Sequence, residues 1–194
     1  MTKKVLKSCV LVASMLLITR AGAVRLRAAS DESLNTQVAD LYQLQAAFHQ
    51  AASGAGVSAD TKAQHLAQML ALFTDDAVLV VGATTYVGKG VPGTVTCDPG
   101  SLTVCDFFTH HAGSFVLGRN WVSLAPSFKT YFDIQGNTAE VYFECHYFDV
   151  ATGVKEADVS FGLLGQPATA QATKVDGTWL LSYGVAGVAP LSAW

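Results

Sequence analysis

The spacing of hydrophobic positions is mostly helical up to about residue 120, apart from a short strand-like run at 77–81, and is strand-like after it. Before that point, side chains suited to a core recur three and four residues apart, which is the spacing of one helix face. The first such stripe consists of Leu34, Val38, Leu41, Gln45 and Phe48. After a break at 53–60, where Ser58 or Asp60 can cap a helix, a second stripe consists of Leu66, Met69, Leu70 and Phe73. A third helix is predicted over about 102–116 from Val104, Phe108, His111 and Phe115.

Strands are predicted in the rest of the chain. A short strand covers 77–81 (AVLVV), and GATTYVGKG turns the chain back after it. Aromatic and β-branched runs then cover 127–135, 138–150, 154–164 and 171–188, with turns at Gly136-Asn137, Thr152-Gly153 and Asp176-Gly177. We expect a four-stranded antiparallel meander there. The order of elements predicts an α+β protein, with three N-terminal helices packed on a curved, mostly antiparallel sheet.

This order, together with four short motifs, resembles the SnoaL-like group of the nuclear transport factor 2-like superfamily. The motifs are LALFTDDAVLVV at 70–81, Tyr86-Val87-Gly88-Lys89-Gly90, Gly136-Asn137-Thr138-Ala139 and Lys174-Val175-Asp176-Gly177-Thr178-Trp179. The resemblance covers roughly 34–188, and residues 97–105 look like an insertion. It implies a cone-shaped barrel with an internal apolar pocket. Members include isomerases, dehydratases, cyclases, epoxide hydrolases and non-catalytic binders, so the fold alone does not fix the function.

The steroid-isomerase branch of that superfamily is disfavoured by the residues present. Its general-base aspartate falls at Val81 and its helix-one phenol at Phe48, and neither side chain can transfer a proton. An acid on a later strand of that branch corresponds most nearly to Asp158.

Residues 1–23 are predicted to form a secretory signal peptide. Lys3, Lys4 and Lys7 precede a ten-residue apolar run at 9–18, and Ala21-Gly22-Ala23 provides small residues for cleavage. Arginines around the exit leave an uncleaved anchor or another cleavage site open. A loose leader at 24–33 and a single domain at 34–194 would follow. We therefore expect a secreted or extracytoplasmic protein with no stable membrane insertion after cleavage.

Charge and cysteines narrow the classes of partner. The whole chain has a net charge of −3, but residues 24–194 carry 8 Lys and Arg against 15 Asp and Glu, a net charge of −7. Such a surface repels phosphate backbones, so nucleic acid is not an expected partner. Cys97 and Cys105 enclose a short loop and could form a disulfide or remain two thiols, and Cys145 lies within a strand as a small buried side chain. No metal-binding or cofactor-binding motif is present in the sequence, and no cofactor is expected.

Glu144 and His146 are the most conspicuous polar pair. They point to one side of the strand at 138–150, opposite Val141, Phe143 and Cys145. The apolar side should face the core, so the pair should lie on the convex face, solvated or in a homodimer contact flanked by Tyr142 and Phe148. The alternative is that Glu144 orients His146 as a general base in the pocket.

His111 is the better candidate for an inward polar group, because it shares its helical stripe with Phe108. It could be a catalytic acid or base, or a core histidine bonded to the backbone. The ligand-binding candidates are Tyr147, Tyr183, Phe108 and Phe143, whereas His49 and His65 are expected at the surface. Two functions follow. One is a pocket protein that binds a small apolar molecule and could catalyse cofactor-free proton transfer, and the other is a non-catalytic binding or dimerising module.

Overall fold

The computed structural model describes residues 33–58, 60–90, 97–112, 119–125 and 130–188. The predicted signal peptide lies outside these residues, as does the predicted leader apart from Ser33. The chain divides into two compact units, residues 1–39 and 40–194. The second unit contains the sheet and both cavities considered below. Within the described ranges, no helix has the length and apolar character needed to cross a membrane.

The first two helices confirm the hydrophobic spacing, and the third is shorter than predicted. They are α2 (Leu34–Ala52) and α3 (Lys62–Leu70), and a third helix begins as α4 (Val104–Asp106). It continues as one turn of π-helix, η1 (Phe107–His111), closed by a hydrogen bond from Ala112 N to Phe107 O. Phe73, predicted on the second helix, instead begins the first strand, because α3 ends at Leu70. Residues 113–116 of the predicted third helix lie outside the described part.

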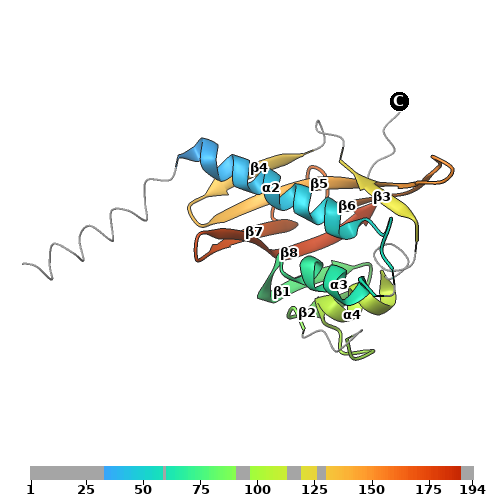
Figure 1. The fold of residues 1–194 in the computed structure, drawn as a ribbon. Helices are drawn as coiled ribbons and strands as arrows, with labels where there is room; N and C mark the ends of the chain where they lie inside the picture. The colour runs from blue at the N-terminus through green and yellow to red at the C-terminus, as the bar shows by residue number, and fades with distance from the viewer. Residues whose placement is uncertain (1–32, 59, 91–96, 113–118, 126–129, 189–194) are drawn as a thin grey trace, which may run out of the picture. The chain divides into compact units, whose positions relative to one another are not determined.

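In the described part of the chain, eight strands form one sheet beside these helices (Figure 1). They are β1 (Phe73–Val81), β2 (Thr84–Val87), β3 (Trp121–Leu124), β4 (Tyr131–Gln135), β5 (Thr138–Asp149), β6 (Lys155–Phe161), β7 (Ala170–Val175) and β8 (Thr178–Val188). The main order is β2-β1-β8-β6-β5-β3, β4 pairs with β5, and β7 pairs with β5 and β8. Every pair is antiparallel except β1 with β8, so the mostly antiparallel sheet is confirmed.

Two strands share one position in this sheet. β7 lies between β5 and β8 near Ala139, and β6 lies between the same two strands near Cys145. The predicted four-stranded meander is therefore present, but its third strand is split into two, β6 and β7, which are separated by residues 162–169. Register shifts at Tyr147/Phe148 and Gln171/Ala172 add local twist, which is how a sheet curves around a helix.

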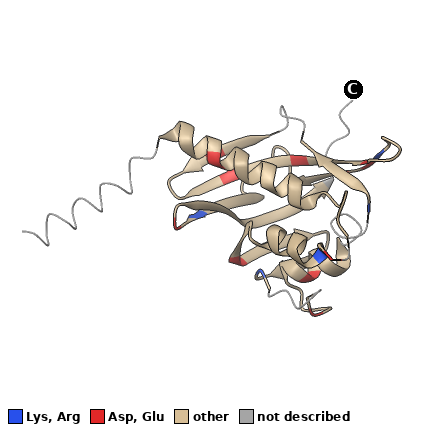
Figure 2. Cartoon of the chain, viewed as in Figure 1, with Lys and Arg blue, Asp and Glu red and all other residues tan. Residues whose placement is uncertain are grey.

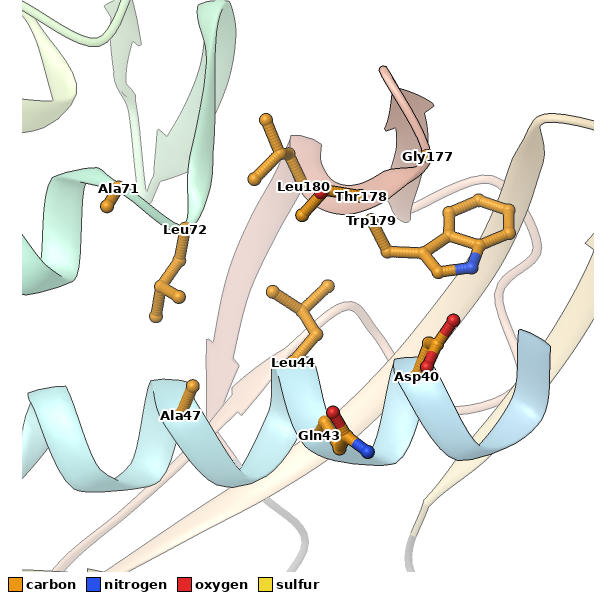
Figure 3. A pocket seen from close by; sticks show the side chains of 10 residues that line it. All are labelled: Asp40, Gln43, Leu44, Ala47, Ala71, Leu72, Gly177, Thr178, Trp179 and Leu180. Atoms are coloured by element: carbon orange, nitrogen blue, oxygen red, sulfur yellow. The ribbon is translucent and has the colours of Figure 1, made fainter. Parts of the chain in front are cut away.

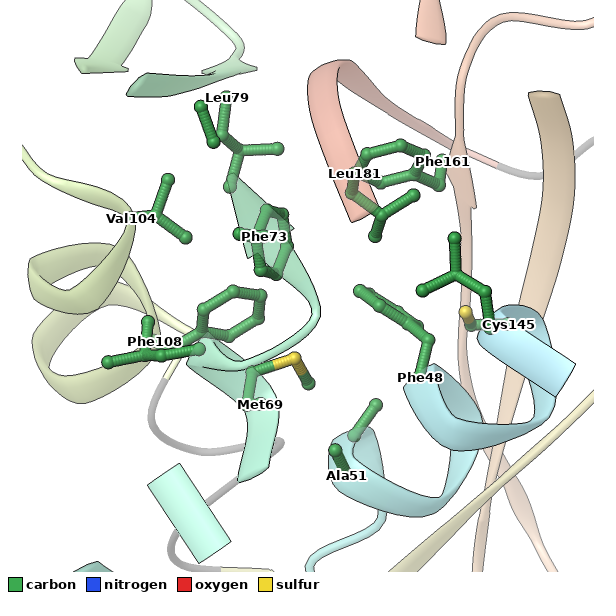
Figure 4. Close-up of a cluster of buried hydrophobic side chains, with 14 of the residues drawn as sticks. Phe48, Ala51, Met69, Phe73, Leu79, Val104, Phe108, Cys145, Phe161 and Leu181 are labelled. Carbon is green, nitrogen blue, oxygen red and sulfur yellow. The ribbon is translucent and has the colours of Figure 1, made fainter. Parts of the chain in front are cut away.

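The core lies where α2 and the π-helix meet the sheet. Figure 4 shows Phe48, Phe73, Phe108 and Phe161 converging from four different elements. The ring centroids of Phe48 and Phe161 are 5.9 Å apart, and those of Phe73 and Phe108 are 5.8 Å apart. These rings fix the helices against one face of the sheet. Phe48, Phe108 and Phe161 also line the cavity described below.

Charged side chains are sparse on this scaffold. Figure 2 shows the lysines and arginines of the described residues scattered over separate elements rather than gathered in a stripe. The expectation that nucleic acid is not a partner continues to rest on the acidic charge and stays a prediction.

Candidate functional site

A cavity of about 470 Å³ lies between α2, η1 and the strands β1, β5, β6 and β8. Cavities of this size hold small-molecule ligands. Most of its walls are apolar or aromatic, and the polar groups are few. It is lined by Phe48, Leu79, Val81, Gly82, Phe107, Phe108, His111, Ala112, Cys145, Tyr147, Val159, Ser160, Phe161, Ala186 and Gly187. Such a lining suits a small, largely apolar molecule.

His111 contributes an imidazole to this cavity, but it lies at the edge of the core. Its side chain is 49% exposed, whereas Phe108 on the same segment is buried. The π-helix explains the difference, because its wider turn rotates His111 out of the stripe that a regular helix would continue. His111, expected to point inward, is therefore a partly exposed residue that faces both solvent and cavity.

A buried carboxylate lies behind His111. His111 Nε2 is 3.8 Å from Asp106 Oδ2, and the Asp106 side chain is fully buried. The Asp106 carboxylate accepts hydrogen bonds from the backbone N–H groups of Gly100 (3.2 Å) and Leu102 (3.0 Å). Those two bonds satisfy part of a charge that is costly to bury. The arrangement places a buried carboxyl group beside the His111 imidazole.

Sequence reasoning missed Asp106, although a local signal exists. Thr103 precedes it by three residues, the spacing of an N-terminal capping pair, and the Thr103 hydroxyl accepts a hydrogen bond from Asp106 N at 3.2 Å. The neighbouring Cys97–Cys105 disulfide is present, with Cα atoms 5.8 Å apart. His110 Nε2 lies 2.8 Å from Cys97 O, so Cys97 is joined to α4 by the disulfide and to the π-helix by this contact.

The other predicted ligand-binding residues divide into two groups. Phe108 and Tyr147 line the cavity, but Phe143 and Tyr183 do not. Phe143 lies behind the cavity wall, stacked on Phe161 with centroids 5.2 Å apart. Tyr183 is half-buried elsewhere on β8.

Tyr147 is held by a small polar cluster beneath α2. It shares hydrogen bonds with Ser123 and Cys145, and burial raises the pKa of Tyr147 well above its usual value. The phenol therefore keeps its proton and can donate a hydrogen bond to a ligand. Burial also raises the pKa of Cys145 to about 12, which removes it as a thiolate nucleophile and confirms it as a buried side chain.

His49 completes this cluster and corrects the expectation of a surface residue. It is buried, with Nδ1 2.9 Å from Ser123 Oγ. Burial, together with a smaller electrostatic contribution from His146, lowers the pKa of His49 to about 4. Ser123 on β3 provides a polar partner that allows His49 to be buried. The hydrophobic spacing of the helix alone does not indicate such a partner.

We expect acid to destabilise the protein through His49. Below pH 6.5 the unfolded chain binds a proton at His49 that the folded chain binds only near pH 4. The contribution of neutral His49 to the free energy of unfolding is therefore complete above pH 6.5 and is lost as the pH falls from 6.5 to 4. At pH 5 the loss should be about 2 kcal/mol. Urea unfolding at pH 7 and pH 5 measures it.

His49→Asn retains a polar group near Ser123 without titrating in this range, so it should remove most of that pH dependence. Burial also lowers the pKa of His65, so His65→Gln is the matched control for the part of the pH dependence that comes from His65. An unchanged slope in His49→Asn would contradict the assignment.

Glu144 and His146 form a buried ionic network rather than a solvated face. His146 Nε2 is 3.0 Å from Glu144 Oε2, and Tyr142 donates to Glu144 Oε1 at 2.7 Å. On the neighbouring strand, Asp158 Oδ1 lies 2.6 Å from His146 Nδ1 without hydrogen-bond alignment, and Asp158 Oδ2 lies 2.8 Å from Lys155 Nζ. Each negative group thus has a positive or hydrogen-bonding neighbour.

Burial overturns the expected exposure of this pair. Glu144 is 0% and His146 2% exposed, and every residue from Val141 to Tyr147 is buried. Tyr142 is equally buried, so these three side chains are not available to a partner chain. The predicted pairing of Glu144 with His146 is real, but its contacts are those of a structural network. The homodimer itself stays a prediction.

Among the described side chains, no group of three or more His, Cys, Asp and Glu residues has the spacing to hold a metal ion.

No protein-family model matches the sequence, and no curated protein matches it. Solved structures do. A protein of unknown function with a cystatin-like fold from Nostoc punctiforme is 14% identical and aligns over 82% of this chain and 95% of its own, with a TM-score of 0.56. An NTF2-like protein with a cystatin-like fold from Novosphingobium aromaticivorans is 14% identical, with coverages of 88% and 90% and a TM-score of 0.54.

LinA is a third structural neighbour, at 11% identity, with coverages of 82% and 92% and a TM-score of 0.51. None of these names specifies the SnoaL-like group, and identities this low show the fold alone. The element order, the sheet pairing and these likenesses agree with one another. The chain has a cystatin-like fold, similar to that of these NTF2-like structures.

Proposed function

We propose that the protein binds a small apolar molecule in the 470 Å³ cavity and transfers a proton to or from it through His111. The observation that carries this proposal is the position of His111, a titratable imidazole on the edge of an otherwise apolar cavity with the buried Asp106 carboxylate 3.8 Å behind it. Asp106 would orient the imidazole and stabilise its protonated form. Isomerase, dehydratase and cyclase reactions all use such a step.

Tyr147 supplies the complementary group. Its protonated phenol lies in the cavity wall and can donate a hydrogen bond to a ligand oxygen that gains charge as the proton leaves carbon. No cofactor enters this proposal, because the imidazole and phenol together provide an acid/base group and a hydrogen-bond donor.

Deuterium incorporation provides the sharpest test of proton transfer. A panel of neutral apolar ketones is incubated with the protein in D₂O, and the exchange of their acidic C–H bonds is followed by mass spectrometry. His111→Gln should lower the exchange rate at least about 100-fold, and Asp106→Asn should lower it less. The matched control is His110→Gln, since His110 is adjacent but does not line the cavity.

A non-catalytic binding module is the second candidate, and one distance favours it. At 3.8 Å the contact between Asp106 and His111 is longer than a hydrogen bond, while the Asp106 carboxylate already accepts two from backbone. Two results together would support binding without catalysis. The protein would bind the neutral probe N-phenyl-1-naphthylamine and lose that binding in Val159→Trp, which fills the cavity. It would also catalyse no deuterium exchange in the ketone panel.

Export of the chain belongs to the same proposal. Export is supported by the charged start, the apolar run and the small residues at 21–23. It is also supported by the Cys97–Cys105 disulfide, a bond typical of oxidising compartments. Mass spectrometry of protein recovered outside the cytoplasm should identify an N-terminal peptide that begins at Val24.

A further inference from the structure

A second cavity, of about 330 Å³, lies on a different part of residues 40–194 (Figure 3). It is enclosed by α2, by the connection from α3 to β1, and by the hairpin between β7 and β8. Its apolar walls come from Leu44, Ala47, Leu72 and Leu180. Its polar end contains Asp40 and Trp179. It shares no lining residue with the cavity of the proposed proton transfer.

The indole of Trp179 is the unexplained feature of this cavity. Trp179 is 3% exposed, and its Nε1–H is buried without a hydrogen-bond partner in the described part of the chain. A buried donor left without an acceptor costs free energy, so most such groups in proteins are paired. Figure 3 shows the indole nitrogen on the side of the ring that faces Asp40.

Asp40 provides a complementary acceptor across the same end of the cavity. Its carboxylate has no hydrogen bond or ion pair to another described residue, and it lines the cavity together with Trp179. The indole N–H of Trp179 and the carboxylate of Asp40 face each other without bonding directly. Between them is a place for a group that both accepts and donates a hydrogen bond.

The polar end is held rigidly by the hairpin. Val175 pairs with Thr178 across a two-residue turn, in which Asp176 (φ 49°) and Gly177 (φ 84°) adopt the left-handed conformation of a tight hairpin. Lys174 Nζ lies 5.5 Å from the centroid of the Trp179 ring and adds a cation–π contact. The site is therefore formed in advance, which lowers the entropic cost of binding.

We propose that this cavity binds a small aliphatic alcohol. The hydroxyl oxygen would accept a hydrogen bond from Trp179 Nε1–H, the hydroxyl hydrogen would be donated to the Asp40 carboxylate, and the carbon body would pack against Leu44, Leu72 and Leu180. An ammonium group cannot accept from the indole, a carboxylate is repelled by Asp40, and a hydrocarbon leaves the indole N–H unpaired.

The indole resonance of Trp179 reports this contact directly. The full-length chain is labelled with ¹⁵N and titrated with cyclohexanol, with methylcyclohexane as the matched hydrocarbon. Cyclohexanol should move the Trp179 indole N–H signal downfield in a saturable way, and methylcyclohexane should not. Asp40→Leu should weaken cyclohexanol binding about tenfold, as expected for loss of a hydrogen bond to a charged group.

Val159→Trp fills the other cavity and serves as the control for the site. The downfield shift should persist in it, because Val159 lines only the larger cavity. Equal shifts from both probes, an unmoved indole signal, or undiminished binding in Asp40→Leu would each overturn the proposal. An unmoved indole signal would leave a resident water as the partner of the indole, and undiminished binding in Asp40→Leu would remove Asp40 as the acceptor. None of them bears on proton exchange at His111, so the two proposals fail separately.

Discussion

Glu144→Ala should destabilise the protein by about 3–5 kcal/mol, the cost of removing one member of a buried ion pair. Glu144 is 0% exposed and receives contacts from both Tyr142 and His146. Its removal leaves the Tyr142 hydroxyl without that acceptor and opens a void in a packed sheet. His146 also loses its contact with Glu144 Oε2 at 3.0 Å. Urea unfolding at pH 7 measures the change in free energy.

Glu140→Ala is the matched control, because Glu140 belongs to the same strand and also accepts from a tyrosine. Tyr131 donates to Glu140 Oε1, but this pair is exposed, so water replaces the lost bond. The expected loss is about 1 kcal/mol or less. Similar losses in the two variants would show that the network around Glu144 is no more important to stability than a surface pair. They would also reopen its assignment as a structural element.

Gly184→Ala is expected to cost about 3 kcal/mol, at the upper end for overpacking a core. A Cβ atom at Gly184 would lie within 3 Å of three carbons of the Phe161 ring, closer than any side chain tolerates. The ring cannot move aside easily, since it is stacked on Phe143 and contacts Phe48. Thermal and urea unfolding should both show the loss.

A double-mutant cycle tests the stated cause. In a Phe161→Leu background the ring is absent, so Gly184→Ala should cost about 1 kcal/mol or less. An equal cost in both backgrounds would mean that glycine is required at 184 for a reason other than the ring. Because Phe161 lines the larger cavity, a pushed ring should also reduce binding of N-phenyl-1-naphthylamine in the single variant.

The sequence determined the fold class through patterns that act over short distances. Helical spacing from Leu34 and Leu66 identified α2 and α3, and paired turn residues such as Asp176-Gly177 identified the hairpins. These signals are local, because a helix or a tight turn depends on residues within a few positions of one another. The Cys97–Cys105 bond belongs to the same class, since the two cysteines are only 8 residues apart.

Only the tertiary structure decided which polar residues are buried and which face a cavity. Alternation along β5 predicted a solvated face for Glu144 and His146. Inside the protein, however, Tyr142 donates a hydrogen bond to Glu144, and Asp158 of the neighbouring strand lies beside His146. His49 is buried because Ser123, 74 residues away, offers it a partner. Asp106 and His111 acquire their relation from a π-helical turn that no hydrophobic spacing indicates. Burial of a polar group depends on partners brought from distant parts of the chain, and the spacing of hydrophobic residues contains no information about them.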